Sequence, residues 1–215
     1  MVIMLHPLLK AVRLLSPKKP ILTPMLQEFF FRQSLVEMGV WGGKIKIDHI
    51  NGRSHHSFCG WVPIVFPNSL ILLLEKIPKV KYRKFFFRGS VYPGREWLFY
   101  YPDVSISDYG RNNQKKYSTD YEYYSVLSGT EFGLSPTGDC PWSYRFFEAI
   151  ICHAIPVLGP KDNDVYSDGF YYFRHGDHFN YSDERCRENY RLFLERHTLR
   201  GIISPAPEKP SGKSA

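Results

Sequence analysis

Short apolar runs and amphipathic runs alternate along the chain between about residues 82 and 198. Apolar runs bounded by turn residues are typical of buried strands, whereas amphipathic runs are typical of helices. We predict five strands, at residues 84–88, 104–107, 131–135, 155–159 and 170–173. We predict three helices, at residues 120–128, 143–153 and 183–197. Strands that alternate with helices favour crossover units on a parallel sheet, and right-handed crossovers make that sheet Rossmann-like.

The first 80 residues have a less regular pattern. Thr23 followed by Pro24 is a typical helix start, because Thr caps and Pro fits the first turn, so we predict a helix over residues 25–38. Residues 44–50 alternate polar and apolar positions, as a half-buried strand does. Residues 68–77 are apolar enough for a buried strand or a short helix, and the pattern does not separate the two.

These changes of pattern divide the chain into three parts. Residues 1–80 form a small N-terminal α/β segment, and residues 81–200 form the domain with the parallel sheet. Residues 201–215 are rich in Pro, Ser, Lys and Gly, which predicts a disordered tail. The predicted fold class is therefore α/β, with a Rossmann-like parallel sheet and a smaller N-terminal segment.

The composition indicates a globular protein, and the net charge indicates the kind of partner that it binds. The chain has 215 residues, 43% of them apolar and 23% charged, which is ordinary for a globular protein and excludes disorder throughout. The formal net charge of +7 suits an anionic partner such as a nucleotide phosphate. The densest basic run, residues 79–88, is interpreted as a solvated basic turn leading into a strand. No further basic and aromatic positions accompany it, so we expect no nucleic-acid partner.

The cysteines and the N-terminus bear on the compartment. No apolar run approaches the roughly 18 residues that span a bilayer, and none in the first 16 residues matches a secretory signal. The four cysteines have neither zinc-site nor Cys-x-x-Cys spacing, so we expect reduced thiols in the cytoplasm. Residues 1–16 have helical spacing of leucines. They form either a helix packed on the domain or a membrane-surface helix with Lys10 and Arg13 toward water, which would give peripheral membrane contact.

The segment from residue 132 to 160 carries the candidate chemistry. It predicts a strand, a turn-rich loop containing Gly138, a helix that begins near Ser143, and a second strand. Ligands of open parallel sheets bind at the carboxyl ends of strands, where helix N-termini attract phosphate. Arg145 lies in the first helical turn, where the helix dipole disfavours a cation and a bound diphosphate would reverse that penalty. The Glu148 carboxylate could accept hydrogen bonds from both ribose hydroxyls of a nucleotide. Alternatively, Arg145 and Glu148 could form an ion pair on the helix surface.

The same segment resembles the signature of exostosin-like glycosyltransferases, Ser-x-Arg-Phe-x-Glu-Ala followed by a helix and a Pro-Val strand. The matching positions are Ser143, Arg145, Phe146, Glu148, Ala149, Ile155, Pro156 and Val157. Upstream, residues 86–90 with Gly94 and Arg95 resemble the strand-and-glycine opening of the same nucleotide-sugar half. The resemblance covers roughly residues 82–175. His153 stands where the family usually has glycine.

This resemblance implies the donor-binding half of a GT-B enzyme, which transfers a sugar from a nucleotide-diphosphate donor to a glycan or other hydroxyl acceptor. It implies inversion at the anomeric carbon, with no metal cofactor. Arg145 and Arg88 would neutralise the diphosphate and Glu148 would hold the ribose. The loop that carries Gly138 and Ser143 would approach the donor.

An inverting transfer also needs a general base for the acceptor hydroxyl, and in this architecture the base comes from the first half. The candidates are Asp48, His49, His55 and His56, each of which is otherwise a solvated loop or strand-end residue. His55 and His56 could form half of a metal site, but no acidic residue or Cys stands at a spacing typical of a metal ligand beside them. About 80 residues are few for a full acceptor domain, so the first half is reduced or completed elsewhere.

Three alternatives stay open. Pro156 to Pro160 also resembles the Pro-Val-Leu-Gly-Pro strand and turn of fucosyltransferases, whose helix usually carries Thr-Glu-Lys where this chain has Ser143, Tyr144 and Arg145. A non-catalytic module could keep the nucleotide-sugar fold without the base. A basic nucleic-acid-binding protein is the third alternative.

Overall fold

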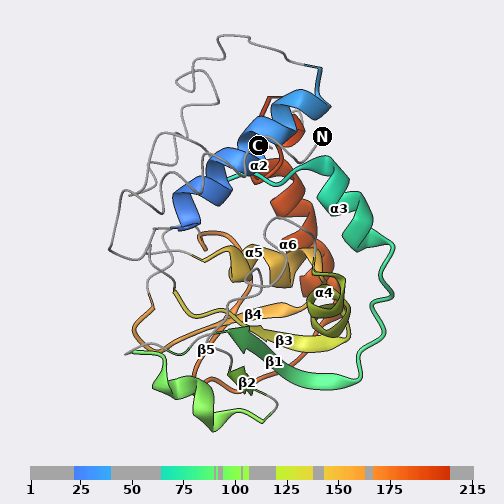
Figure 1. The fold of residues 1–215 in the computed structure, drawn as a ribbon. Helices are drawn as coiled ribbons and strands as arrows, with labels where there is room; N and C mark the ends of the chain where they lie inside the picture. The colour runs from blue at the N-terminus through green and yellow to red at the C-terminus, as the bar shows by residue number, and fades with distance from the viewer. Residues whose placement is uncertain are drawn as a thin grey trace, which may run out of the picture.

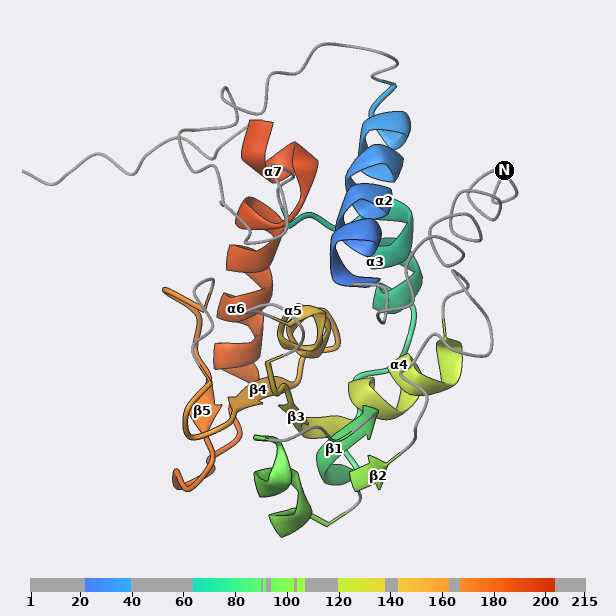
Figure 2. The same ribbon diagram turned by 60° about the vertical axis from the view of Figure 1, so that its left-hand side comes forward.

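The structure is a computed structural model that describes residues 22–39, 64–89, 91, 94–102, 104–106, 120–137, 143–162 and 167–203. In the described part, helices cover one face of a parallel sheet, and a short 3-10 helix lies on the other face (Figures 1 and 2).

The sheet has five strands in the order β2-β1-β3-β4-β5, and every neighbouring pair is parallel. The strands are β1 (Arg83–Gly89), β2 (Val104–Ile106), β3 (Thr130–Leu134), β4 (Ile155–Leu158) and β5 (Phe173–Arg174). In the register of the central strands, Phe85 lies opposite Phe132, which lies opposite Ile155 on its other side. The predicted α/β fold with a Rossmann-like parallel sheet is confirmed.

The described helices are α2 (Leu22–Glu37), α3 (Asn68–Glu75), η2 (Glu96–Tyr100), α4 (Tyr121–Ser128), α5 (Tyr144–Ile151), α6 (Asp183–Arg196) and α7 (Leu199–Ile203). Three of the described helices begin at a side-chain cap, whereas α2 begins at Leu22, one residue before the predicted cap Thr23. The side chains of Asp120, Ser143 and Ser182 each accept a hydrogen bond from a backbone N–H in the first turn of α4, α5 and α6. Residues 68–77, which fit either a strand or a helix, form α3.

The strand order fixes which face each connection covers. The β2–β3 and β3–β4 crossovers run in the same direction across the sheet, so the right-handed rule places α4 and α5 on one face. The β1–β2 connection runs the opposite way and carries η2 to the other face. Packing agrees, because Phe86 joins the cluster with α4 and α5 whereas Phe85 and Phe87 join the cluster with Trp97 of η2. The switch of faces occurs between β1 and β3.

Most predicted boundaries differ from the structure by one to three residues, and packing explains two of the differences. Residues 201–203 belong to α7, so the predicted disordered tail began too early, because Ile202 packs with Phe31 and Val65. The last strand is Phe173–Arg174 instead of residues 170–173, since Phe170 packs among the helices. The strand predicted over residues 44–50 lies outside the described residues.

The described N-terminal elements share the core of the sheet domain. Ile64, Phe66 and Leu74 are buried in the same cluster as Phe147 of α5 and Phe193 of α6. Within the described ranges, we find no helix with the length and apolar character needed to span a bilayer.

The basic run is not a solvated turn at its start. Lys79 donates to the Leu74 carbonyl oxygen (2.7 Å) and Lys81 donates to the Ser128 carbonyl oxygen (2.8 Å), so both ammonium groups cap helix C-termini. Burial lowers the pKa of Lys81 to about 8. The pattern of basic residues did not show this, because the carbonyl oxygens belong to the ends of two helices, one of them 47 residues further along the chain.

Candidate functional site

The candidate site lies at the carboxyl edge of the sheet, where β1 and β3 end and α5 begins. In open parallel sheets, ligands bind at the point where consecutive connections leave for opposite faces. Here that point lies between β1 and β3. The Ser143 side chain accepts a hydrogen bond from the Arg145 N–H (3.2 Å) and fixes the start of α5 beside this edge.

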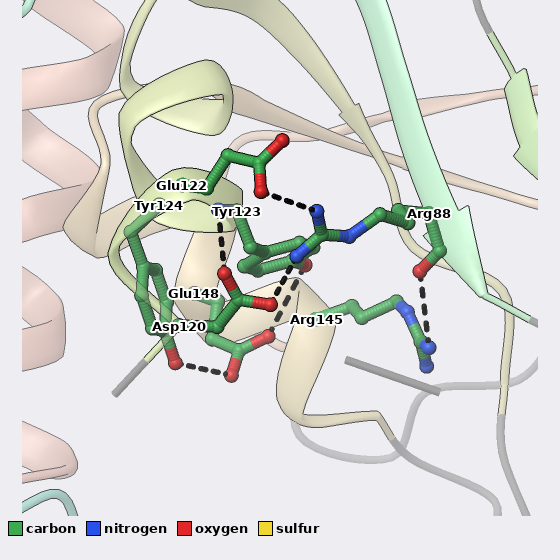
Figure 3. A network of polar contacts seen from close by, with 7 residues as sticks. All are labelled: Arg88, Asp120, Glu122, Tyr123, Tyr124, Arg145 and Glu148. Atoms are coloured by element: carbon green, nitrogen blue, oxygen red, sulfur yellow. Dashed lines mark hydrogen bonds and ion pairs between the residues drawn. The ribbon is translucent and has the colours of Figure 1, made fainter. Parts of the chain in front are cut away.

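Arg145 extends from the first turn of α5 across the carboxyl end of β1 (Figure 3). Its Nη2 lies 3.5 Å from the Arg88 carbonyl oxygen, and its guanidinium lies over the Phe87 ring at 5.2 Å from the centroid. A side chain at Gly89 would occupy the same space, because an added Cβ would lie 2.5 Å from Nη2. The glycine therefore makes room for a cation at the switch point of the sheet.

Glu148 leaves α5 in a different direction and is 1% exposed. Its Oε1 accepts a hydrogen bond from the Tyr124 hydroxyl (2.9 Å), and its Oε2 lies 3.4 Å from the Tyr123 hydroxyl. Both tyrosines belong to α4, so the carboxylate joins the two crossover helices. The ribose contact that the resemblance implies for Glu148 requires the groups that cover this carboxylate to move.

Arg88 is engaged by carboxylates of α4 and its N-terminal cap. Its guanidinium forms an ion pair with Asp120, whose other oxygen caps α4 through the Tyr123 N–H (3.0 Å). Glu122 lies 3.8 Å from the same guanidinium. Of the two cations assigned to the diphosphate, Arg88 pairs with Asp120, and Arg145 lies over the Phe87 ring beside the Arg88 carbonyl oxygen.

A polar cluster at the ends of β3 and β4 was not predicted from the sequence. The Asp162 carboxylate accepts hydrogen bonds from the Gly159 N–H (2.8 Å) and the Thr137 hydroxyl (2.7 Å). Arg95 donates from Nε to the Thr137 carbonyl oxygen (2.9 Å), and Arg174 donates to the Asp162 carbonyl oxygen (2.7 Å). The one sequence signal was Gly159-Pro160 at the end of a predicted strand, which marks the turn that brings Asp162 back to the edge.

His153 adopts a backbone conformation that explains why a glycine would suit its position. Its φ is +55°, the left-handed region, directly after the end of α5. Its ring packs on the ring of Tyr190 in α6, and the two ring centroids are 5.0 Å apart. Burial, with Lys79 and Lys81 nearby, lowers the pKa of the imidazole to about 4.

The other candidate residues lie outside the described part of the chain, and the comparisons with protein families and curated proteins found no match. Asp48, His49, His55, His56 and Gly138 lie outside the described residues. Among the residues that are described, no group of three or more His, Cys, Asp or Glu side chains is arranged to hold a metal ion. No protein-family model matches the chain, and no curated protein matches it.

Proposed function

We propose that the chain is an exostosin-like glycosyltransferase that uses a nucleotide-diphosphate sugar. The observation that carries the proposal is the position of Arg145, which lies at the carboxyl edge of β1 beside the N-terminus of α5. A cation is disfavoured at the positive end of a helix dipole. A diphosphate bound there would interact favourably with the guanidinium and with the backbone N–H groups of the helix start.

The motif residues occupy consistent places in the fold. Ser143, Arg145 and Glu148 lie on one crossover helix between β3 and β4, and Pro156 and Val157 lie within β4. This is the arrangement that the resemblance implies for a donor-binding half. Arg145 would stabilise the leaving diphosphate, and Glu148 would hold the ribose after the groups over it move.

The transfer that we propose balances without a redox partner. The bond between the anomeric carbon and the diphosphate oxygen breaks, and the electron pair leaves with the diphosphate. A bond forms between that carbon and the acceptor hydroxyl oxygen, whose proton passes to a general base. Asp48, His49, His55 and His56 remain the predicted candidates for this base, with a glycan as the predicted acceptor.

A thermal-shift screen tests donor binding. The probes are UDP, GDP and dTDP, together with UDP-glucose, UDP-N-acetylglucosamine, GDP-mannose, GDP-fucose and dTDP-glucose. A ligand that binds only the native state at 100 times its Kd stabilises it by about 2.7 kcal/mol, so a concentration-dependent rise in Tm is expected for one nucleotide. Absence of a shift with every probe at millimolar concentration would overturn the proposal.

Matched variants assign the binding to the proposed site. Arg145→Gln should lose most of the nucleotide-dependent shift, measured from its own Tm without ligand. Arg185→Gln removes an equal charge from an exposed position on α6 and should keep the shift. Release of nucleoside diphosphate from the sugar nucleotide then separates an enzyme from a module that binds without turnover.

A further inference from the structure

The Asp162 cluster (Trp97, Thr137, Gly159, Asp162 and Arg174) gathers at the carboxyl ends of β3 and β4. Thr137 approaches from the β3 side, and its hydroxyl and N–H both donate to Asp162, at 2.7 and 3.3 Å. Gly159 follows β4 directly and donates its N–H to Asp162 Oδ2 at 2.8 Å. Three protein donors therefore hold this carboxylate in one orientation.

Trp97 reaches the same place from η2, on the opposite face of the sheet from α5. Only 5% of the residue is exposed, and among the described residues none accepts a hydrogen bond from its buried Nε1. A Cβ added to Gly159 would lie 2.6 Å from Trp97 Nε1 and 2.7 Å from Asp162 Oδ2. The indole N–H and the carboxylate oxygen therefore converge on the space that the missing side chain leaves.

The backbone around this point is held by two guanidinium groups. Arg174 donates from Nη1 to the carbonyl oxygens of Gly159 (3.3 Å) and Asp162 (2.7 Å). Arg95, which is 7% exposed, donates to the Thr137 carbonyl oxygen. A buried N–H without an acceptor is rare, and one that is fixed beside an oriented carboxylate is typical of a preorganised binding position.

We propose that Trp97 Nε1 and Asp162 bind a hydroxyl group of the sugar moiety of the nucleotide sugar. A hydroxyl accepts one hydrogen bond and donates another, which matches an indole donor beside a carboxylate acceptor. The Asp162 carboxylate would repel a phosphate group. The partial positive charge on the Trp97 N–H would repel a cation. The inference rests on the proposed function and adds to it the group that distinguishes a sugar nucleotide from a free nucleotide.

The spacing across the sheet suits one ligand. Arg145 lies over the end of β1, and the Asp162 cluster lies over the ends of β3 and β4, the next two strands. Neighbouring strands are about 4.8 Å apart, so the two positions are separated by roughly 5–10 Å along this direction. A diphosphate at Arg145 can thus place the attached sugar at the cluster.

The experiment compares a sugar nucleotide with the matching free nucleoside diphosphate by isothermal titration calorimetry. The pairs are UDP with UDP-glucose, GDP with GDP-mannose, and dTDP with dTDP-glucose. Trp97→Phe removes the N–H, and we expect a roughly tenfold weaker affinity for the sugar nucleotide, as for a lost buried hydrogen bond. The affinity for the free nucleoside diphosphate should stay within about twofold. Tyr101→Phe is the matched control, because it removes a nearby hydroxyl that contacts His175 instead of the cluster.

The outcomes separate the two proposals. If Trp97→Phe weakens both ligands of a pair by the same factor, or neither, the sugar-hydroxyl site is wrong and the nucleotide site stands. If none of the nucleotides binds the wild-type protein, the proposed function itself is wrong. If Trp97→Phe does not fold, Thr137→Val replaces it, because this variant removes the hydroxyl that orients Asp162 Oδ1. A loss confined to the sugar nucleotide supports the site, and any other result for that variant overturns it.

Discussion

Substitution of Gly89 by alanine is the sharpest perturbation of the Arg145 position. The new Cβ would lie 2.5 Å from Arg145 Nη2 and 3.3 Å from Phe87 Cζ. Favourable contacts between heavy atoms lie near 3.5 Å, so the guanidinium has to move by roughly 1 Å. The 3.3 Å contact with the Phe87 ring needs only a small shift of the ring. The Arg145 guanidinium is therefore the group that has to move furthest.

The magnitudes differ for stability and for binding. The clash involves the far end of a flexible side chain, but Gly89 has φ +157°, a backbone conformation that an L side chain rarely adopts. The free energy of unfolding of Gly89→Ala should therefore fall by about 1–3 kcal/mol. A hydrogen bond between a charged donor and a phosphate contributes about 1.5–3 kcal/mol, which corresponds to roughly a 10- to 100-fold change in Kd. We therefore expect the affinity for the nucleoside diphosphate to fall by about that factor.

A double-mutant cycle tests the cause. Isothermal titration calorimetry compares wild type, Gly89→Ala, Arg145→Gln and the double variant, with the nucleoside diphosphate among UDP, GDP and dTDP that gives the largest thermal shift. If alanine acts by displacing the guanidinium, the double variant binds as Arg145→Gln alone does. Wild-type affinity in Gly89→Ala, or losses that add in the double variant, would refute the reasoning.

Three further predictions concern the framework of the site. In urea denaturation, Tyr124→Phe should lower the free energy of unfolding by about 2 kcal/mol, because its hydroxyl lies 2.9 Å from the Glu148 carboxylate. Tyr123→Phe should lower it by less, because its hydroxyl lies 3.4 Å from the same carboxylate, and the reverse order would contradict this. Gly133→Ala should cost about 1–3 kcal/mol in the same assay, because its Cβ would lie 2.7 Å from a Cβ of α5, and an unchanged midpoint would count against that packing. Unfolding raises the pKa of His153 from about 4 to 6.5, so the unfolded chain binds the extra proton and stability should fall as pH drops from 6.5 to 4. His153→Asn should flatten that part of the pH profile, and an unchanged slope would contradict the assignment.

Local sequence signals predicted the framework because each depends on neighbouring residues. The amphipathic runs predicted helices at residues 120–128, 143–153 and 183–197, and the structure has α4, α5 and α6 there, each capped by a side chain. The short helices η2 and α7 were not predicted, since a helix of five residues carries little periodic signal. Helix α7 is held by contacts with residues far away in sequence, such as those between Ile202 and Phe31.

The site was only partly predictable, because sequence spacing does not fix side-chain direction. Arg145 and Glu148 are three residues apart and could have paired on the helix surface. Gly89 and Phe87 instead provide a place for the guanidinium over β1, while two tyrosine hydroxyls of α4 engage the carboxylate. Both determinants come from other elements of the fold.

The two arginines at the end of β1 lie in different electrostatic surroundings. Arg88 forms an ion pair with Asp120, and the same carboxylate caps α4, so an anion that drew Arg88 away would also weaken the start of that helix. Arg145 lies in the first turn of α5, where the helix dipole disfavours its charge, and it contacts the Phe87 ring and the Arg88 carbonyl oxygen. An anion bound beside the start of α5 would relieve that repulsion, whereas an anion at Arg88 would compete with the Asp120 carboxylate. The diphosphate should therefore bind between Arg145 and the start of α5, and Arg88 should keep α4 in place.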